Sequence, residues 1–443
     1  MLEDEINILI ANIYSFLLTD KKIPKHGNLI KKHSINLFEQ GELSFPNDIK
    51  CWIQYLDQKL LPNEANLMKY IGKGAEILIK ESKKWNLSIE KVIELKGRLF
   101  IHVDRPKAMS LCFFNSHRNN QILLSELIKE NSSICADPLD HESTCITSLR
   151  VCCLTRVIQH LYGIHKCKDN VSERIFVTSR SSSKFGENKV ILCGTVLNSD
   201  TGMKETASNA DDFIRLRQDE LTLIAQHKYG VRVSTESKWK EFISKLGKSA
   251  VNFELLQTKP SSAVKIKFDS SSGSSKRAAF ILYNCARLET IIRTYNERVE
   301  AGRYPQLPKI DDADFSLLNQ DDEWSIIFNY ILGFPSFLKS TVDLEQGRCE
   351  FRPHLICSFL SSMVGEFSQY YRRVRILTEP RKHLLPVLFA RIYMLKSLND
   401  TLKICLKILN IDSVTQMYSS VLFYTYSDKM NVIVFIFIVK NIR

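Results

Sequence analysis

The hydrophobic pattern is clearest between Phe351 and Met417, where two apolar stripes follow one another. In the first stripe, apolar side chains recur at alternating spacings of four and three residues: Ile356, Leu360, Met363, Phe367, Tyr370, Val374 and Leu377. The second stripe has a similar period: Leu388, Ile392, Leu395, Leu398, Leu402, Cys405 and Leu409. This period keeps one face of an α-helix apolar. Because the segment TEPRKHLLP between the stripes carries two prolines, we predict two antiparallel helices.

Two further stripes precede this pair and are expected to pack with it. The segment from Ala278 to Gly302 has the stripe Ile281, Cys285, Leu288, Ile292, Tyr295 and Val299. Gly302 suits a helix end, since glycine adopts positive φ without a steric cost. A shorter helix follows with Trp324, Ile327, Ile331 and Phe334. We therefore predict one α-helical bundle over residues 278–417, after a Ser-rich linker at 270–277.

The rest of the chain has weaker patterns. Residues 1–97 are predicted to form a mainly helical domain, with one helix at 4–18 and a longer one at 63–85. Short β-type runs start at Arg98 and recur at 174–178 and 189–197, alternating with helical patterns at 149–163, 211–230 and 237–256. Residues 98–269 are thus a mixed α/β region. The predicted fold class is mainly α, with a smaller mixed α/β middle region and a C-terminal α-helical bundle.

The distribution of charge indicates which part of the chain binds a partner. The whole chain has a net charge of +12 and a pI near 9.0, which permits a polyanionic partner. Residues 351–417 carry ten Lys plus Arg against four Asp plus Glu, a net of +6. Much of this charge lies around the predicted turn, so we expect function at the basic end of the bundle.

Composition and the two ends of the sequence bear on location. The 12 cysteines form no CxxC pair, which is typical of reduced thiols in a cytoplasmic protein. Acidic residues follow Met1, where a signal peptide would be basic, so we expect no export. The apolar run Val432 to Val439 is far shorter than the ~20 residues of a membrane-spanning helix, so no membrane segment is expected. We interpret residues 418–443 as an atypical apolar tail and an alternative C-terminus.

Enzyme signatures are missing from the sequence. It contains no GxSxG or HExxH motif, and GKGAE at 72–76 lacks the spacing of a phosphate-binding loop. His160, His165 and Cys167 have no second ligand pair at zinc-site spacing. We expect no catalytic residue, no metal and no cofactor.

The segment QYYRRVR offers chemistry that suits RNA. Single-stranded bases stack on aromatic rings and Arg planes, while Lys and Arg follow the phosphate backbone. Tyr370 lies on the apolar stripe and is predicted to be core, whereas Tyr371, Arg372 and Arg375 lie off it. The alternative is an ordinary solvated basic helix face.

These segments also resemble the DALR anticodon-binding domain at the C-terminus of arginyl-tRNA synthetases. That family has a YxxYAxAR helix, which Tyr283, Asn284, Ala286 and Arg287 match in part. A second family pattern begins with PH and ends with CRVL, and it is matched by Pro353, His354, Leu360, Phe367, Tyr371, Arg375 and Leu377. The similarity covers about residues 245–417. It implies a tRNA-binding bundle, with Tyr283, Arg287, Tyr371, Arg372, Arg375, Arg381 and Lys382 as candidate RNA-binding residues.

The rest of the sequence departs from the synthetases. A class I synthetase needs an HxGH element and a KMSK-type loop. The nearest strings are HLYGIH, which has an extra residue, and KAMS at 107–110, which precedes it in the chain. A DALR domain without a synthetase active site resembles the animal family of DALR anticodon-binding domain-containing proteins. That resemblance implies an adaptor that presents arginine tRNA to a tRNA cytosine-N3 methyltransferase.

Three functions are therefore considered. The leading hypothesis is a non-catalytic tRNA-binding adaptor in tRNA modification. The second is a divergent arginyl-tRNA synthetase, which would need ATP. The third is a protein-interaction scaffold that does not bind RNA.

Overall fold

The computed structural model describes residues 2–18, 29–56, 66–129, 133–141, 144–165, 174–180, 185–186, 188–229, 237–268, 275–344 and 348–413. The predicted tail at 418–443 and residues 270–274 of the predicted linker lie outside these ranges. The chain forms two compact units, each built from separate segments. The first comprises Met1–Asn119, Arg298–Phe337 and Tyr370–Leu398, and the second comprises Asn120–Glu297, Leu338–Gln369 and Asn399–Arg443.

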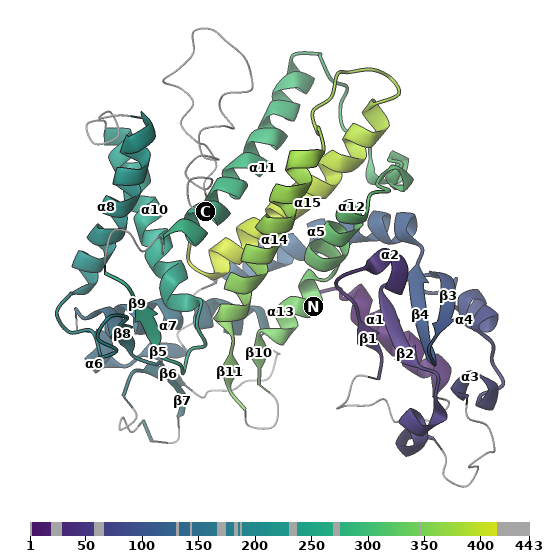
Figure 1. Cartoon of the computed structure of the whole chain (residues 1–443), viewed down its shortest axis with the longest axis horizontal. Coiled ribbons are helices and arrows are strands. Elements are labelled where there is room, and N and C mark those ends of the chain that lie inside the picture. The colour runs from purple at the N-terminus through teal and green to yellow at the C-terminus, as the bar shows by residue number, and fades with distance from the viewer. Residues whose placement is uncertain are drawn as a thin grey trace. The chain divides into compact units, whose positions relative to one another are not determined.

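The N-terminal part of the first unit combines short helices with an antiparallel sheet (Figure 1). The sheet has the order β1-β2-β4-β3, with β1 Lys31–Lys32, β2 Leu43–Pro46, β4 Arg98–Val103 and β3 Ile89–Leu95. The helices are α1 Glu5–Leu17, α2 Leu37–Gln40, a 3-10 turn Ile49–Tyr55, α3 Leu67–Tyr70 and α4 Ala75–Ser82. Helix α1 confirms the predicted helix at 4–18, and Asp4 caps its start.

Two predictions in this part are wrong. The helix predicted at 63–85 is broken into α3 and α4, because Gly72 adopts a φ of +64° and Gly74 precedes the second helix. The strand at 98–103 does not open the middle region. It pairs with β2 and β3 instead. The turn between β3 and β4 consists of Lys96 and Gly97, which both have positive φ. That is the backbone of a two-residue hairpin.

The middle region confirms the predicted mixture of helices and strands. A parallel sheet has the order β5-β6-β7, with β5 Ile134–Ala136, β6 Ile175–Thr178 and β7 Lys189–Leu192, and β8 Val196–Asn198 pairs in parallel with β9 Val264–Ile266. The helices are α5 Arg105–Leu127, α6 Pro138–His141, α7 Ile146–His165, α8 Ala210–Tyr229 and α10 Ser237–Leu256. Helix α5 was missed, because its core side includes polar side chains such as Asn115 and Asn119.

The C-terminal helices confirm the predicted bundle. They are α11 Lys276–Glu300, α12 Asp321–Ile326, the π-helical segment Ile327–Leu332, α13 Phe334–Ser340, α14 Pro353–Arg373 and α15 Leu385–Ile408. Two 3-10 turns, Ile310–Asp312 and Phe315–Leu317, precede α12, and the hairpin of β10 Val342–Asp343 and β11 Glu350–Phe351 leads into α14. Within the second unit, Lys403 of α15 forms an ion pair with Glu289 of α11.

Most residues of the predicted stripes form the bundle core, although Ile292 and Val299 of α11 are only half-buried. Every stripe residue of α15, and those of α14 from Ile356 to Tyr370, are buried. Helix α14 ends at Arg373, earlier than predicted, so Val374 and Leu377 are only half-buried and Ile376 takes the core position. Gly302 has a φ of +66° just after α11, which confirms the predicted helix end.

Two buried arginines hold the second unit together. The fully buried guanidinium of Arg150 in α7 donates to the backbone carbonyls of Leu255 (3.1 Å), Gly194 (2.6 Å) and Ser262 (2.7 Å), and burial lowers its pKa. Arg217 in α8 donates twice to the Glu254 carboxylate of α10, at 2.9 and 3.1 Å. These two side chains therefore link helices and loops whose contacts could not be predicted from the hydrophobic pattern.

We predict that Arg150→Met lowers the free energy of unfolding by about 3 kcal/mol or more, because the substitution leaves buried carbonyls without donors. Urea unfolding followed by circular dichroism measures this change. Arg156→Met, at an exposed position of the same helix, is the matched control and should change stability by less than about 0.5 kcal/mol. Equal effects of the two substitutions would contradict the assignment.

Candidate nucleic-acid interface

The candidate interface lies where α14 ends and the chain turns toward α15. We call residues 371–383, sequence YRRVRILTEPRKH, the basic loop. It contains five Lys or Arg and one Glu, a net charge of +4 with His neutral. Arg372 and Arg373 occupy the last turn of α14, where a cation is favoured by the partial negative charge of the helix end.

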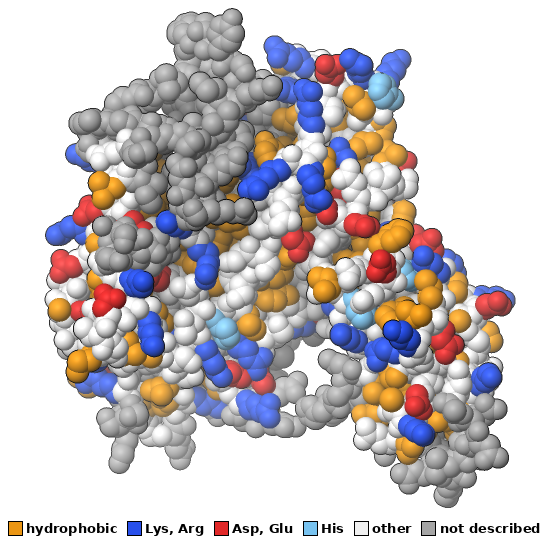
Figure 2. Space-filling model, in the orientation of Figure 1, with side chains coloured by type: hydrophobic (Ala, Val, Ile, Leu, Met, Phe, Trp, Pro, Cys, Tyr) orange, Lys and Arg blue, Asp and Glu red, His pale blue; other side chains and the backbone are white. Residues whose placement is uncertain are grey.

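The structure exposes most of the predicted cations of this loop. Arg372, Arg375, Arg381 and Lys382 are exposed, and Tyr371 is half-buried. Figure 2 shows Lys and Arg side chains, with a His among them, gathered over the turn between α14 and α15. These five residues are the part of the predicted site that the fold brings together.

Only part of this charge is neutralised within the protein. Arg381 forms an ion pair with Glu379 at 2.7 Å, and Arg373 forms one with Asp322. Within the described ranges, Arg372, Arg375 and Lys382 form no ion pair. Their charges therefore remain available to an anionic ligand.

A buried carboxylate contacts the two helices that flank the basic loop. Glu323 of α12 is fully buried, and its Oε1 accepts from the Tyr370 hydroxyl at 2.8 Å and from Nε of Arg391 at 2.9 Å. Tyr370 lies in the last turn of α14, and Arg391 lies in α15. Burial, and then the neighbouring Glu323, raise the pKa of Tyr370, so its hydroxyl remains the donor.

The middle of the basic loop is held by Tyr304, just after α11. The Tyr304 hydroxyl donates to the Thr378 carbonyl and accepts from Arg298 at 2.8 Å. Tyr304 is itself buried. The loop is thus attached to α11, α12 and α15 rather than only to its own helix.

The other two predicted residues, Tyr283 and Arg287, lie elsewhere. Both are buried in α11 and belong to the second unit, whereas the basic loop belongs to the first. Arg287 donates to the Tyr283 hydroxyl and, at 3.2 Å, to Asn284. Its guanidinium carbon lies 4.3 Å from the centre of the Tyr283 ring. The structure places this pair in the packing of α11.

Sequence reasoning missed Glu323, Tyr304 and Arg391. A partial signal for Glu323 was its position three residues after Gln320, where a Glu can accept from the N-cap backbone as in a capping box, although Gln is not the usual first residue of that pattern. The backbone N–H of Gln320 donates to Glu323 at 3.3 Å. No comparable signal marks Tyr304 or Arg391, since each works only through a partner that is distant in sequence.

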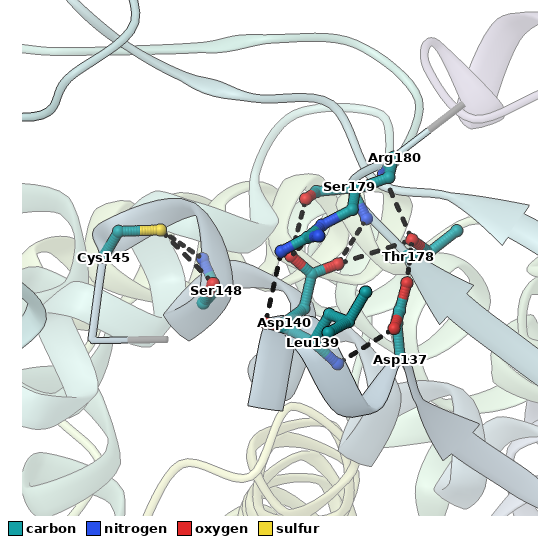
Figure 3. A network of polar contacts seen from close by, with 8 residues as sticks. All are labelled: Asp137, Leu139, Asp140, Cys145, Ser148, Thr178, Ser179 and Arg180. Carbon is teal, nitrogen blue, oxygen red and sulfur yellow. Dashed lines mark hydrogen bonds and ion pairs between the residues drawn. The ribbon is translucent and has the colours of Figure 1, made fainter. Parts of the chain in front are cut away.

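The parallel sheet presents a second cluster of polar side chains, at the carboxyl ends of β5 and β6 (Figure 3). Asp137 accepts from the Thr178 hydroxyl at 2.8 Å, and Asp140 accepts from the hydroxyl and the backbone N–H of Ser179 at 2.7 and 2.8 Å. Nucleotides bind at this edge in doubly wound sheets. In this protein the carboxylates of Asp137 and Asp140 already accept hydrogen bonds from Thr178 and Ser179.

The histidines considered as metal ligands contact backbone carbonyls instead. His160 Nδ1 lies 2.9 Å from the Ile408 carbonyl, and His165 lies 2.8 Å from that of Leu161 and 3.1 Å from that of Leu338. Cys167 lies outside the described residues. Over the described ranges, no group of three or more His, Cys, Asp or Glu is arranged to hold a metal ion.

Comparisons with known proteins support the assignment of the C-terminal helical bundle. Residues 281–417 match the family model of the DALR anticodon binding domain. The C-terminal bundle is of the DALR anticodon-binding type. The chain is 31% identical, over 264 residues, to "DALR anticodon-binding domain-containing protein 3" of Danio rerio, covering 57% of this chain and 46% of that protein. The mouse protein of that name is 34% identical over 216 residues, 48% of this chain and 40% of the relative. The chain thus spans less than half the length of these relatives.

Solved structures show the wider fold. The arginyl-tRNA synthetases of Plasmodium falciparum and Thermus thermophilus superpose with TM-scores of 0.56 and 0.52, at 10% and 11% identity, over 94% of this chain and the whole of theirs. The architecture around the DALR bundle is therefore synthetase-like. Among the described helices, none has the length and apolar character needed to cross a membrane.

We predict that Arg287→Ala destabilises the protein, lowering the free energy of unfolding by about 1–3 kcal/mol, since it removes buried hydrogen bonds and a ring contact. Arg372→Ala, at an exposed position, should leave stability unchanged. Urea unfolding of both variants tests this contrast. A fully stable Arg287→Ala protein with weakened RNA binding would instead assign Arg287 to the interface.

Proposed function

We propose that this protein is a non-catalytic tRNA-binding adaptor. The basic loop of the DALR bundle binds the anticodon arm of arginine tRNA, and the protein presents this tRNA to a modifying enzyme, a tRNA cytosine-N3 methyltransferase. The observation that carries the proposal is a cationic loop, fixed at both ends and in the middle, on a bundle of the anticodon-binding type.

The chemistry of the loop fits an RNA arm. Arg372, Arg375 and Lys382 can neutralise phosphates, and each such contact releases counterions. Tyr371, half-buried at the same helix end, has an aromatic ring of the kind on which an unstacked base stacks. Because the loop is already held in place, binding costs little conformational entropy, and less of the favourable electrostatic free energy is lost to ordering the loop.

The absence of catalysis is also part of the proposal. KAMS lies in the first turns of α5 and HLYGIH in the last turns of α7, so neither string sits in a loop that could hold ATP. The sheet edge that binds nucleotides in related folds is occupied by the Asp137 and Asp140 hydrogen bonds. Arginine-dependent exchange of pyrophosphate into ATP would favour the divergent synthetase instead.

The proposed location is the cytoplasm. The cysteines in the described ranges are not joined in disulfides, which suits a reducing compartment. The third function, a scaffold without RNA, would be favoured if purified protein showed no electrophoretic shift with tRNA.

We predict that Arg372→Ala with Arg375→Ala weakens tRNA binding about ten- to a hundredfold near 0.1 M salt, and lowers the slope of log affinity against log salt by about 1 to 2. Filter binding across a salt series measures both quantities. The matched control replaces Lys80 and Lys83, exposed on and just after α4, by Ala. The proposal fails if the folded double variant binds like the wild type.

We also predict that cells lacking this protein lose most N3-methylcytosine from arginine tRNA while keeping it in other tRNAs. Sequencing of reverse-transcription stops at the modified position measures this. Re-expression of the Arg372→Ala, Arg375→Ala variant should not restore the modification. Unchanged methylation in the knockout would contradict the adaptor role but leave tRNA binding open to the filter assay.

A further inference from the structure

The interface depends on a residue that does not touch solvent. Glu323 is fully buried, and its Oε1 receives two donors from the helices on either side of the basic loop, Tyr370 of α14 at 2.8 Å and Arg391 of α15 at 2.9 Å. Its Oε2 accepts from the backbone N–H of Gln320 at 3.3 Å. Nothing in this arrangement leaves the carboxylate free to contact a ligand.

Helix α12, which carries Glu323, is fixed in turn to the N-terminal sheet. The neighbouring residue Trp324 donates from its indole to Oε1 of Glu42 at 2.8 Å. Glu42, also fully buried, accepts from the Val103 backbone at 2.8 Å and forms an ion pair with Arg105 at 3.2 Å. All these residues belong to the first unit, together with the basic loop.

We propose that Glu323 is a positioning residue for the basic loop: it holds the ends of α14 and α15 in the register that presents Arg372 and Arg375 to RNA. The inference rests on the proposed tRNA binding and deepens it. The N-terminal sheet, through Glu42 and Trp324, supplies the fixed base from which Glu323 acts.

A loop that must be ordered upon binding binds more weakly than one that is already ordered. The two donors, Tyr370 and Arg391, are 21 residues apart in sequence, and one carboxylate oxygen joins them. Without the negative charge, the partly buried Arg391 loses its anion, and the neutral amide of Gln cannot accept both bonds equally well. The ends of the loop then separate more easily.

The test uses the whole 443-residue chain and unmodified arginine tRNA transcripts. Glu323→Gln keeps the shape of the side chain and every exposed cation. We expect about tenfold weaker tRNA binding, and faster amide hydrogen exchange in residues 371–384 than in the wild type, at a temperature where circular dichroism shows both to be folded. A purely structural loss would instead speed exchange throughout the first unit.

A second variant keeps the test decisive if Glu323→Gln does not fold. Tyr370→Phe removes only the hydroxyl that contacts Glu323, and we expect it to weaken binding about threefold with the same local change in exchange. In the double variant the two effects should be less than additive, because both break one network. Folded variants that bind tRNA like the wild type, or whose loop exchange is unchanged, overturn the inference.

The experiment separates this inference from the proposed function. If the wild type does not bind tRNA, the proposed function fails, and the positioning role for RNA fails with it. If the wild type binds and Arg372→Ala with Arg375→Ala weakens binding while Glu323→Gln does not, only the positioning role fails.

Discussion

The arrangement of the basic loop depends on burying one carboxylate. Removing an ion such as Glu323 from water costs several kcal/mol unless charged or polar donors replace the lost hydration. Tyr370, Arg391 and the Gln320 backbone supply those donors. Because they come from three separate segments, the carboxylate is satisfied only when the ends of α14 and α15 and the start of α12 are all in place. The cost of burying the charge thus enforces one geometry for the loop.

A second consequence concerns which parts of the chain fold together. The basic loop belongs to the same compact unit as the N-terminal sheet, although about 270 residues separate Val103 from Arg372 in sequence. Two adjacent residues of α12 explain this, since Glu323 contacts the loop and Trp324 contacts Glu42. The N-terminal region is therefore part of the support of the interface.

Sequence patterns predicted the helices whose one face is continuously apolar, such as α14 and α15, since that signal is local. They failed where an element is stabilised by contacts with distant segments and not by its own apolar pattern. Strand β3 is mostly exposed and shows no apolar alternation, and α5 buries asparagines. The same division applies to the site. Arg372 and Arg375 could be proposed because charge is visible in sequence, whereas the roles of Tyr304 and Glu323 depend on contacts between distant segments. Arg287 is a different case, because its buried partners Tyr283 and Asn284 belong to its own helix but charge alone does not reveal its burial.

The polar cluster at the ends of β5 and β6 and the basic loop differ in how many of their polar groups already have partners within the protein. At the carboxyl ends of β5 and β6, Asp137 and Asp140 already accept from Thr178 and Ser179, so a ligand would have to break those hydrogen bonds before gaining its own. In the basic loop, the exposed Arg372 and Arg375 have no described ion-pair partner, so an anion gains their attraction without displacing a protein carboxylate. The basic loop therefore carries charge that the protein does not itself neutralise, whereas the hydrogen-bonding groups at the ends of β5 and β6 are already paired.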